Sequence, residues 1–444
     1  MNASERPDLC MPTAPPADET AGPLAVPLYD TSHLQRIDIG RRALRVLQEV
    51  RALPDLLDHV WFDGDTVQFP LERSLGRFWW RQDGGWELLG AAQGSVRIPP
   101  ECDVRFANES NALTSADIDP LLIIPQLVRL DLTGRWVDDA LMQQFVALPR
   151  LVTLAMHHGR LTADGVRALE LARDLTVLML DATVTEASAL EALPLLPNLR
   201  RFTLQRTALP QAAAETLGAT STLTALSLRD ADLSDERVRA LRGLSLRTLD
   251  IGRNPLTDRA LPGLVSSLLE SVQTLALDGT SITGAGALHL RSCANLHELD
   301  LSSTAVDTDR VAHLLHTLPL EHLALNWTPV DAGVFVRTHA RTLTSLELRG
   351  NHWPKAAWSL LATACPLLAR LDLAYSSVDD EHLAHIADLQ HLTHLNLRSA
   401  TITDAAIEPL LRMPHLEWLG VQGTLLTRDG INAIHAAKPA LMLG

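Results

Sequence analysis

A short hydrophobic pattern that returns about every 24 residues constrains this chain most. From Pro125 onward the pattern L-x-x-L-x-L occurs thirteen times, with 23 to 26 residues between copies. So regular a spacing predicts one structural unit that is stacked many times, because each unit can bury its apolar side only against its neighbours. The middle leucine, or the phenylalanine that replaces it, falls at Leu130, Leu154, Leu178, Phe202, Leu226, Leu249, Leu275, Leu299, Leu323, Leu346, Leu371, Leu395 and Leu419.

The composition agrees with a repeated core that is filled by leucine. The 444 residues include 85 leucines, of which 71 lie between residues 121 and 444, against only seven Phe and two Tyr. Phe106 lies 24 residues before the first middle leucine, and Leu443 lies 24 after the last. We therefore expect a degenerate strand at 102–106, and a chain that stops inside a fourteenth unit.

Each repeat reads as a strand, a turn and a helix. In L-x-x-L-x-L the leucines alternate inward from a short strand, and the residues between them face the opposite side. Eight residues after the middle leucine comes a Ser, Thr or Asp that suits a helix N-cap. A short amphipathic segment such as DRVAHLLHTL then follows. The expected caps are Asp138, Thr162, Ser234, Thr257, Thr283, Asp307, Asp331, Asp379, Thr403 and Thr427.

Segments such as LALDGTSITGAGALHL and LDLSSTAVDTDRVAHLL resemble leucine-rich repeats of the roughly 24-residue bacterial type, as in effectors of plant pathogens. In that family an Asn five residues after the middle leucine hydrogen-bonds the turn, layer upon layer. Here Asn254 and Asn351 keep it, whereas Thr is commoner and can donate and accept in the same ladder. The resemblance implies a curved α/β solenoid, with a parallel sheet on the concave face and helices outside.

Three repeats depart from the pattern. In the third repeat the aliphatic residue of the turn comes one position early, at Val184. Pro210 and Pro354 occupy cap positions, so we expect their helices to start one residue later or to be irregular. The C-terminal KPALMLG has no polar cap, which predicts an edge strand that is bare or covered by a partner, in a monomer or an edge-paired assembly.

The chain before the repeats divides into three expected parts. Residues 1–27 are rich in Pro and Ala and predict a disordered tail, without the features of a classical signal peptide. Residues 28–106 predict a small α+β capping module with a helix over 37–53 and a hairpin at Asp83-Gly84-Gly85. Residues 107–124 form a junction to the repeat domain, 125–444. Four tryptophans, expected as the module's core or alternatively as an exposed ligand platform, are Trp61, Trp79, Trp80 and Trp86.

Charge and cysteine usage limit the partners and the compartment. A formal charge of −15 argues against nucleic acid as the main partner, and no apolar run reaches the length of a membrane span. Four widely separated cysteines fit a reducing compartment. We expect a cytoplasmic protein, or one that is exported into a host cell by a non-classical route.

The repeat register identifies the residues of the concave face. The outward positions lie one residue before, one after and three after each middle leucine. Charge is densest between repeats eight and twelve, and two aromatic residues stand one position further, at the rim. We expect a protein partner to contact this region, although its charges can also simply pair across adjacent strands. The candidate residues are Glu298, Asp300, Asn326, Trp327, Glu347, Arg349, Arg370, Asp372, Tyr375 and Arg398.

Motifs of catalysis or metal binding are weak. His313-x-x-His316 and His382-x-x-His385 place two imidazoles on one helix face, but no acidic third ligand accompanies them. His157 and His158 are adjacent in the strand and point to opposite sides. No P-loop, G-x-S-x-G or Cys-centred nucleophile motif occurs. We expect no metal, no cofactor and no enzymatic activity, and leave residues 28–106 open on the last point.

Two functions remain at this stage. The first is a non-enzymatic scaffold that binds a partner protein on the concave face. A bacterial host-directed effector is one setting for such a scaffold. The second rests on residues 53–61 (LPDLLDHVW), Pro70-Leu71 and residues 78–81 (FWWR), which are faintly similar to an F-box. An F-box joined to leucine-rich repeats implies a substrate adaptor of a ubiquitin ligase. A β-prone TVQF interrupts the segment where an F-box needs a helical hairpin.

Overall fold

The computed structural model describes residues 62–63, 66–82, 85–108, 115–134, 137–145, 148, 150–183, 187–191, 193–220, 222–331, 333–336, 338, 340–354 and 356–444. The expected tail at 1–27, the helix at 37–53, Trp61, the turn residues Asp83 and Gly84, and Val184 lie outside these residues.

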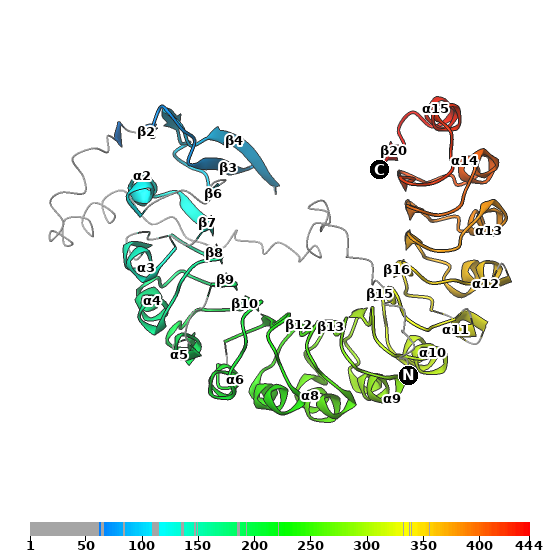
Figure 1. Ribbon diagram of the computed structural model, residues 1–444, viewed down its shortest axis with the longest axis horizontal. Helices are drawn as coiled ribbons and strands as arrows, with labels where there is room; N and C mark the ends of the chain where they lie inside the picture. The colour runs from blue at the N-terminus through cyan, green and yellow to red at the C-terminus, as the bar shows by residue number, and fades with distance from the viewer. Residues whose placement is uncertain are drawn as a thin grey trace, which may run out of the picture.

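The repeats form an open horseshoe with a parallel sheet along its inner side and helices along its outer side (Figure 1). Every middle leucine pairs in register with the next one, from Leu130 with Leu154 to Leu419 with Leu443. The predicted α/β solenoid is therefore confirmed. The strands are β6 (Val104–Asn108), β7 (Leu127–Thr133), β8 (Thr153–His157), β9 (Val177–Asp181), β10 (Arg201–Gln205), β11 (Ala225–Ser227), β12 (Thr248–Asp250), β13 (Thr274–Ala276), β14 (Glu298–Asp300), β15 (His322–Ala324), β16 (Ser345–Glu347), β17 (Arg370–Asp372), β18 (His394–Asn396), β19 (Trp418–Gly420) and β20 (Met442–Leu443).

Short helices return the chain from the end of one strand to the start of the next. The α-helices are α2 (Asp119–Leu122), α3 (Asp139–Phe145), α4 (Ala163–Ala168), α5 (Ala187–Glu191), α6 (Gln211–Gly218), α7 (Asp235–Val238), α8 (Leu261–Leu268), α9 (Gly284–Ala287), α10 (Thr308–Thr317), α11 (Gly333–Val336), α12 (Ala356–Ala364), α13 (Asp380–Ile386), α14 (Ile407–Leu411) and α15 (Arg428–Ala437). Several are completed by a turn of 3₁₀-helix, at 115–118, 169–171, 193–195, 239–243, 258–260, 288–292 and 404–406. None of the described helices is long and apolar enough to cross a membrane.

The helix starts follow the sequence closely. Each of the ten expected caps accepts a hydrogen bond from a backbone N–H in the first turn of its helix. The expected delay at Pro210 was wrong, because α6 begins directly after it, at Gln211. Pro210 has φ −67° and ψ 160°, an extended conformation that both an N-cap and a proline ring allow.

A second polar ladder ties neighbouring repeats together at these caps. The carboxylate of Asp258 accepts hydrogen bonds from the backbone N–H and the hydroxyl of Thr283, at 2.7 and 2.6 Å. Asp380 does the same for Thr403, at 2.8 and 2.6 Å. The cap of one helix is thus held by the first residue of the helix before it, which stabilises the stacking of the repeats.

Both asparagines of the turn position reach the preceding repeat. Asn254 is 2% exposed and bonds Leu228 and Ala231 of that repeat as well as its own turn. Asn351 donates to the carbonyl of Leu325 at 2.9 Å. Among the threonines, Thr183 contacts the carbonyl of Met156 in the preceding repeat, whereas Thr280 donates to Leu277 within its own repeat.

The N-terminal β-strands continue the solenoid sheet. β3 (Gly76–Gln82) and β4 (Gly85–Ala91) form the expected hairpin, and β3 also pairs antiparallel with β6. β6 in turn runs parallel to β7 and pairs Phe106 with Leu130, which confirms the degenerate strand. A separate small sheet contains β1 (Phe62–Asp63), β2 (Thr66–Gln68) and β5 (Ser95–Arg97).

Phenylalanine fills the core of this N-terminal region. Phe78 lies between Phe69 and Phe106, with ring centroids 5.5 and 5.2 Å apart, and all three rings are buried. Trp79, Trp80 and Trp86 are half-buried. The expected tryptophan core was therefore wrong for these three residues, because Phe69, Phe78 and Phe106 occupy the buried positions.

The last described strand, β20, pairs parallel with β19. Met442 in this strand is 61% exposed. Whether a partner covers this edge stays a prediction.

Candidate functional site

The candidate residues form one continuous patch on the concave side of β14–β18. Across β14–β17 the strand register forms two rows, one of Glu298, His322, Ser345 and Arg370 and the other of Asp300, Ala324, Glu347 and Asp372. Two residues beyond the ends of β15, β16 and β18 lie Asn326, Arg349 and Arg398, with Trp327 and Tyr375 at the rim. The residues that the register groups together are thus neighbours in the structure, and whether a partner contacts them stays a prediction.

Eight carboxylates occupy outward strand positions, and they fall into two groups. Five form ion pairs, namely Asp131, Asp181, Asp250, Asp278 and Asp372. Three form none with any described residue, namely Glu298, Asp300 and Glu347. We call the concave side of β7–β13, where all the acids are paired, the paired region. The concave side of β14–β18, which holds the three unpaired acids, is the open region.

Arginines neutralise the acids at the start of the paired region. Asp131 accepts from Arg105 at 2.5 Å and from Arg129 at 3.0 Å. Arg105 also lies over the ring of Trp79, 4.8 Å from its centroid. Further along, Asp181 contacts Arg206 at 2.7 Å and His157 at 3.3 Å. Burial opposes the charge of Asp181, but these hydrogen bonds prevail and lower its pKa to about 2.

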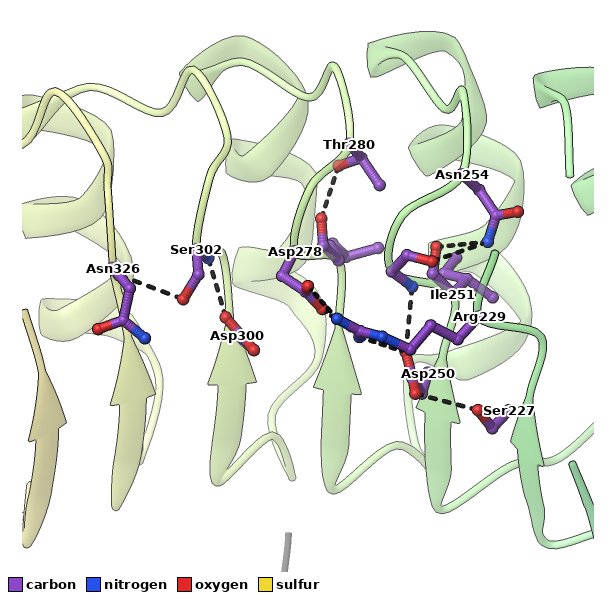
Figure 2. Close-up of polar contacts among 12 residues, drawn as sticks. Ser227, Arg229, Asp250, Ile251, Asn254, Asp278, Thr280, Asp300, Ser302 and Asn326 are labelled. Carbon is purple, nitrogen blue, oxygen red and sulfur yellow. Dashed lines mark hydrogen bonds and ion pairs between the residues drawn. The ribbon is translucent and has the colours of Figure 1, made fainter. Parts of the chain in front are cut away.

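A clamp across three strands lies at the end of the paired region (Figure 2). Arg229, just after β11, reaches over β12 and forms two hydrogen bonds of 2.6 and 2.5 Å with Asp278, just after β13. It also lies 3.5 Å from Asp250. Gly252 makes the reach possible, because a Cβ there would stand 2.3 Å from Asp278 and 2.7 Å from Arg229.

The three unpaired acids accept hydrogen bonds only from neutral groups. Glu298 contacts the Thr274 hydroxyl at 3.1 Å, and Asp300 accepts from the backbone N–H of Ser302 at 2.9 Å. Asn326 donates to Glu347 at 2.9 Å. Burial, with smaller contributions from Asp278 and Glu347, raises the pKa of Asp300 to about 6 against the hydrogen bonds of Ser302. None of the three carboxylates is therefore matched by a direct ion pair with a described residue.

Arginine returns at the far side of the open region. Arg349 donates to Asp372 at 2.7 Å, and Asn396 donates to the same carboxylate at 3.0 Å. Arg398 contacts Gln422. Arg370 is exposed and forms no ion pair with a described residue. The region is thus acidic over β14–β16 and turns basic over β17–β18.

Two exposed aromatic side chains mark the rim of the open region. Trp327 is 56% and Tyr375 46% exposed, with ring centroids 6.2 Å apart. We call these two residues the aromatic pair. Both have a left-handed backbone, φ 56° and 58°, as does Gly350 between them at φ 70°. A third concave aromatic, Trp418, stacks on His394 with centroids 6.3 Å apart.

Neither the register nor the composition revealed the clamp or the backbone of the aromatic pair. The fourth residue after each middle leucine is left-handed in repeat after repeat, for example at His158, Arg206, Ser303 and Ser399. Glycines at Gly279, Gly350 and Gly423 were the signal that could have identified this column. Gly252, one position earlier, was the signal for the clamp.

Three of the histidines that were considered as metal ligands contact other side chains. His382 is buried and bonds Asp379 at 2.5 Å in the cap of α13. His385 contacts the Ser359 hydroxyl, and His157 contacts Asp181. Within the described part of the chain, no group of three or more His, Cys, Asp or Glu is arranged to hold a metal ion.

Comparison with known proteins gives one family match and several structural neighbours. A profile described as "Leucine Rich repeat" matches residues 388–411, which run from the end of α13 to the end of α14. A leucine-rich-repeat protein of Leptospira interrogans is 18% identical, with a TM-score of 0.42 over 73% of this chain and 86% of that one.

Two further solved structures are similar at the same level. An internalin of Listeria monocytogenes is 18% identical, with a TM-score of 0.44 over 71% of this chain and 86% of that one. TLR13 in a complex with ssRNA13 is 17% identical, with a TM-score of 0.45 over 71% of this chain and 55% of that one. These TM-scores are low, so the assignment rests on the chain's own repeats. Residues 388–411 match the leucine-rich-repeat profile, and the thirteen stacked strand–turn–helix units have the leucine-rich-repeat solenoid fold.

Proposed function

We propose that the protein is a non-enzymatic scaffold that binds a partner protein on its concave face, with the open region as the centre of the contact. Solenoids in general use their extended concave surfaces for binding. The observation that carries the proposal is the aromatic pair, because monomeric proteins seldom expose clustered large aromatic side chains without a binding role. Trp, Tyr and Arg also dominate measured binding hot spots, and all three occur here.

The contrast with the paired region supports this placement. In the paired region, ion pairs within the chain already satisfy each outward carboxylate, as in the Arg229 clamp. In the open region, Glu298, Asp300 and Glu347 keep acceptor capacity that a partner can use. We further propose that this scaffold acts as a bacterial effector directed at a host cell.

The F-box-like alternative is less compatible with the structure. An F-box needs helices where this chain has β2 at Thr66–Gln68 and β3 at Gly76–Gln82. Residues 53–61 of the similarity lie outside the described part. Failure of the full-length chain to bind a Skp1-type adaptor in a pull-down would remove this alternative.

Affinity capture from lysate with mass spectrometry tests the scaffold role. The bait is the full-length chain, compared with the concave variant Trp327→Gly/Tyr375→Gly. We expect the wild-type chain to retain a defined protein, and the concave variant to lose at least about nine-tenths of it, as truncation of hot-spot residues generally does.

A matched convex variant controls for the number and kind of substitutions. Leu171→Ser/Leu367→Ser changes two exposed apolar residues on the outer side. It is expected to retain the partner. Equal retention by the concave and wild-type baits would contradict the placement of the site, and retention of no protein by the wild-type bait would contradict the scaffold role.

A further inference from the structure

The aromatic pair stands where bulky residues are least suited to the backbone. A side chain in the left-handed conformation crowds the following carbonyl, which disfavours this conformation for every residue except glycine. Bulky residues are therefore rare in it. The same column holds glycine at Gly279, Gly350 and Gly423. Neither backbone preference nor burial explains a Trp and a Tyr at two of its positions.

The geometry leaves one face of the tryptophan open. Trp327 lies against Gly350, where a Cβ would come within 2.1–2.4 Å of the six-membered part of the indole. Glycine is thus required beneath the ring. Tyr375 stands beyond Gly350, with its ring tilted 35° to that of Trp327. The two rings form a shelf, and the exposed side of the shelf presents π faces to a partner.

The adjoining charges decide which partner group fits the shelf. Asn326, directly before Trp327, donates to the carboxylate of Glu347 and so holds that acid beside the strand end from which the tryptophan projects. Glu298 and Asp300 extend the acidic surface over β14. An aromatic face and a carboxylate both attract cations, the first through its quadrupole and the second through its charge.

We propose that the aromatic pair, together with Glu298, Asp300 and Glu347, is a docking surface for a basic segment of a partner protein, whose arginine or lysine side chain lies on the ring of Trp327. This inference rests on the proposed function, since it names the partner chemistry for the same face. Arg349 is neutralised by Asp372, but Arg370 is not and repels a cation. The basic segment therefore lies over β14–β16, and its less basic end faces β17–β18.

A charged peptide probe tests this chemistry without knowledge of the partner. Fluorescein-labelled deca-arginine is titrated with the full-length chain, and binding is followed by fluorescence anisotropy at two salt concentrations. Deca-glutamate serves as the opposite probe. We expect deca-arginine to bind more weakly at high salt, because screening weakens contacts between exposed charges, and deca-glutamate not to bind.

Charge-matched variants separate this surface from the general acidity of the protein. Glu298→Gln/Asp300→Asn/Glu347→Gln removes three charges and keeps one acceptor oxygen at each position. Glu170→Gln/Glu270→Gln/Glu408→Gln removes three charges from exposed positions elsewhere. We expect about a tenfold loss of deca-arginine affinity for the first variant and less than about twofold for the second, because exposed charges act mainly on close partners. Equal losses would overturn the proposal.

The aromatic contribution has its own test. Trp327→Gly/Tyr375→Gly places the residue best suited to the backbone at both positions, so Tm is expected to stay within about 4 °C of the wild-type value. Trp327→Leu/Tyr375→Leu keeps apolar bulk and removes the π faces. Both variants are expected to weaken deca-arginine binding about fivefold or more. Unchanged binding in the leucine variant would overturn the cation–π contact.

The outcomes also separate this inference from the scaffold role. If a captured protein depends on the concave face but deca-arginine does not bind, the scaffold role stands and the basic partner is wrong. If deca-arginine binds as expected but no protein is captured, the chemistry of the surface stands and the scaffold role fails.

Discussion

The paired and open regions of the concave face are built from the same repeat, yet they treat charge in opposite ways. In the paired region Arg105, Arg129, Arg206 and Arg229 satisfy every outward carboxylate. In the open region three carboxylates have no cationic partner among the described residues, and two large aromatic rings are exposed. An intramolecular ion pair stabilises the fold at that point, whereas a carboxylate without an ion pair can bind a cation of a partner.

The difference separates stability from binding along one surface. Substitutions in the paired region are expected to lower the free energy of unfolding and to change binding little. Substitutions in the open region are expected to weaken binding and to change the free energy of unfolding little. The predictions below test this separation, in order of decreasing effect.

Removal of the clamp arginine should give the largest loss of stability. Arg229→Leu leaves Asp250 and Asp278 without their cation, close to Asp300. Because these groups are partly buried, we expect the free energy of unfolding to fall by about 2–3 kcal/mol, measured by chemical denaturation. The matched change in the open region, Glu347→Gln, is expected to stay within about 0.5 kcal/mol. Equal effects would remove the distinction between the regions.

A methyl group beneath the clamp should have the next largest effect. Gly252→Ala puts a Cβ 2.3 Å from Asp278 and forces the clamp apart. We expect a loss of about 1–2 kcal/mol, as for other overpacked sites. Ala374 occupies the same position of its repeat, so the backbone itself accepts alanine. In an Arg229→Leu background the glycine substitution should cost much less, and full additivity of the two changes would contradict the steric account.

The cap ladder on the outer side should respond equally behind both regions. Asp258→Ala removes the two hydrogen bonds to Thr283 behind the paired region, and Asp380→Ala removes those to Thr403 behind the open region. We expect each to cost about 1 kcal/mol of unfolding free energy, as for other cap contacts. A cost more than about twice as large at one of the two sites would show that the regions differ in the scaffold itself and not only in their concave charges.

The pH dependence should have opposite sign in the two regions. Asp181 has a pKa lowered to about 2, so its charge stabilises the fold above its ordinary pKa, and this contribution is lost as the pH falls toward 2. Asp300 has a pKa raised to about 6, so its charge destabilises the fold at neutral pH, and the penalty disappears as the pH falls through 6 toward 4.

Substitution of Asp300 isolates the contribution of its charge to the free energy of unfolding. We expect Asp300→Asn to raise the free energy of unfolding by about 0.5–1 kcal/mol at pH 7.5, since the carboxylate is only partly screened by solvent. The gain should shrink as the pH falls through 6 and vanish below the ordinary pKa of the carboxyl, 3.8. A gain that is independent of pH would show that ionisation of Asp300 is not its source. Thermal unfolding over this pH range provides the measurement.

The sequence predicted the strands, their register and the helix caps, because each follows from a local pattern repeated thirteen times. Alternating leucines determine which side chains face inward, and one repeat length sets the pairing of Leu130 with Leu154 and of each later pair. The residues of the open region follow from this register. The tryptophan core failed for the opposite reason: Trp79, Trp80 and Trp86 occur once, outside the repeat, so no pattern indicates which face of the sheet they share.

The local sequence pattern could not predict side-chain contacts between repeats. The clamp joins residues 49 positions apart, and it depends on the missing side chain of Gly252 in the repeat between them. The left-handed column at Trp327 and Tyr375 depends on how the chain leaves each strand. A sequence identifies which residues lie on the concave face, but whether an acid finds an arginine depends on side-chain reach in three dimensions.

Photo-crosslinking from the aromatic pair tests the central claim most directly. The full-length chain carries p-benzoylphenylalanine in place of Tyr375, in place of His157 in the paired region, or in place of the exposed Leu171 on the convex side. After irradiation in lysate, we predict that one defined protein is crosslinked from position 375 and is absent, or much weaker, from positions 157 and 171. Equal crosslinking from all three positions, or crosslinking only from position 157 or 171, would contradict a partner site in the open region.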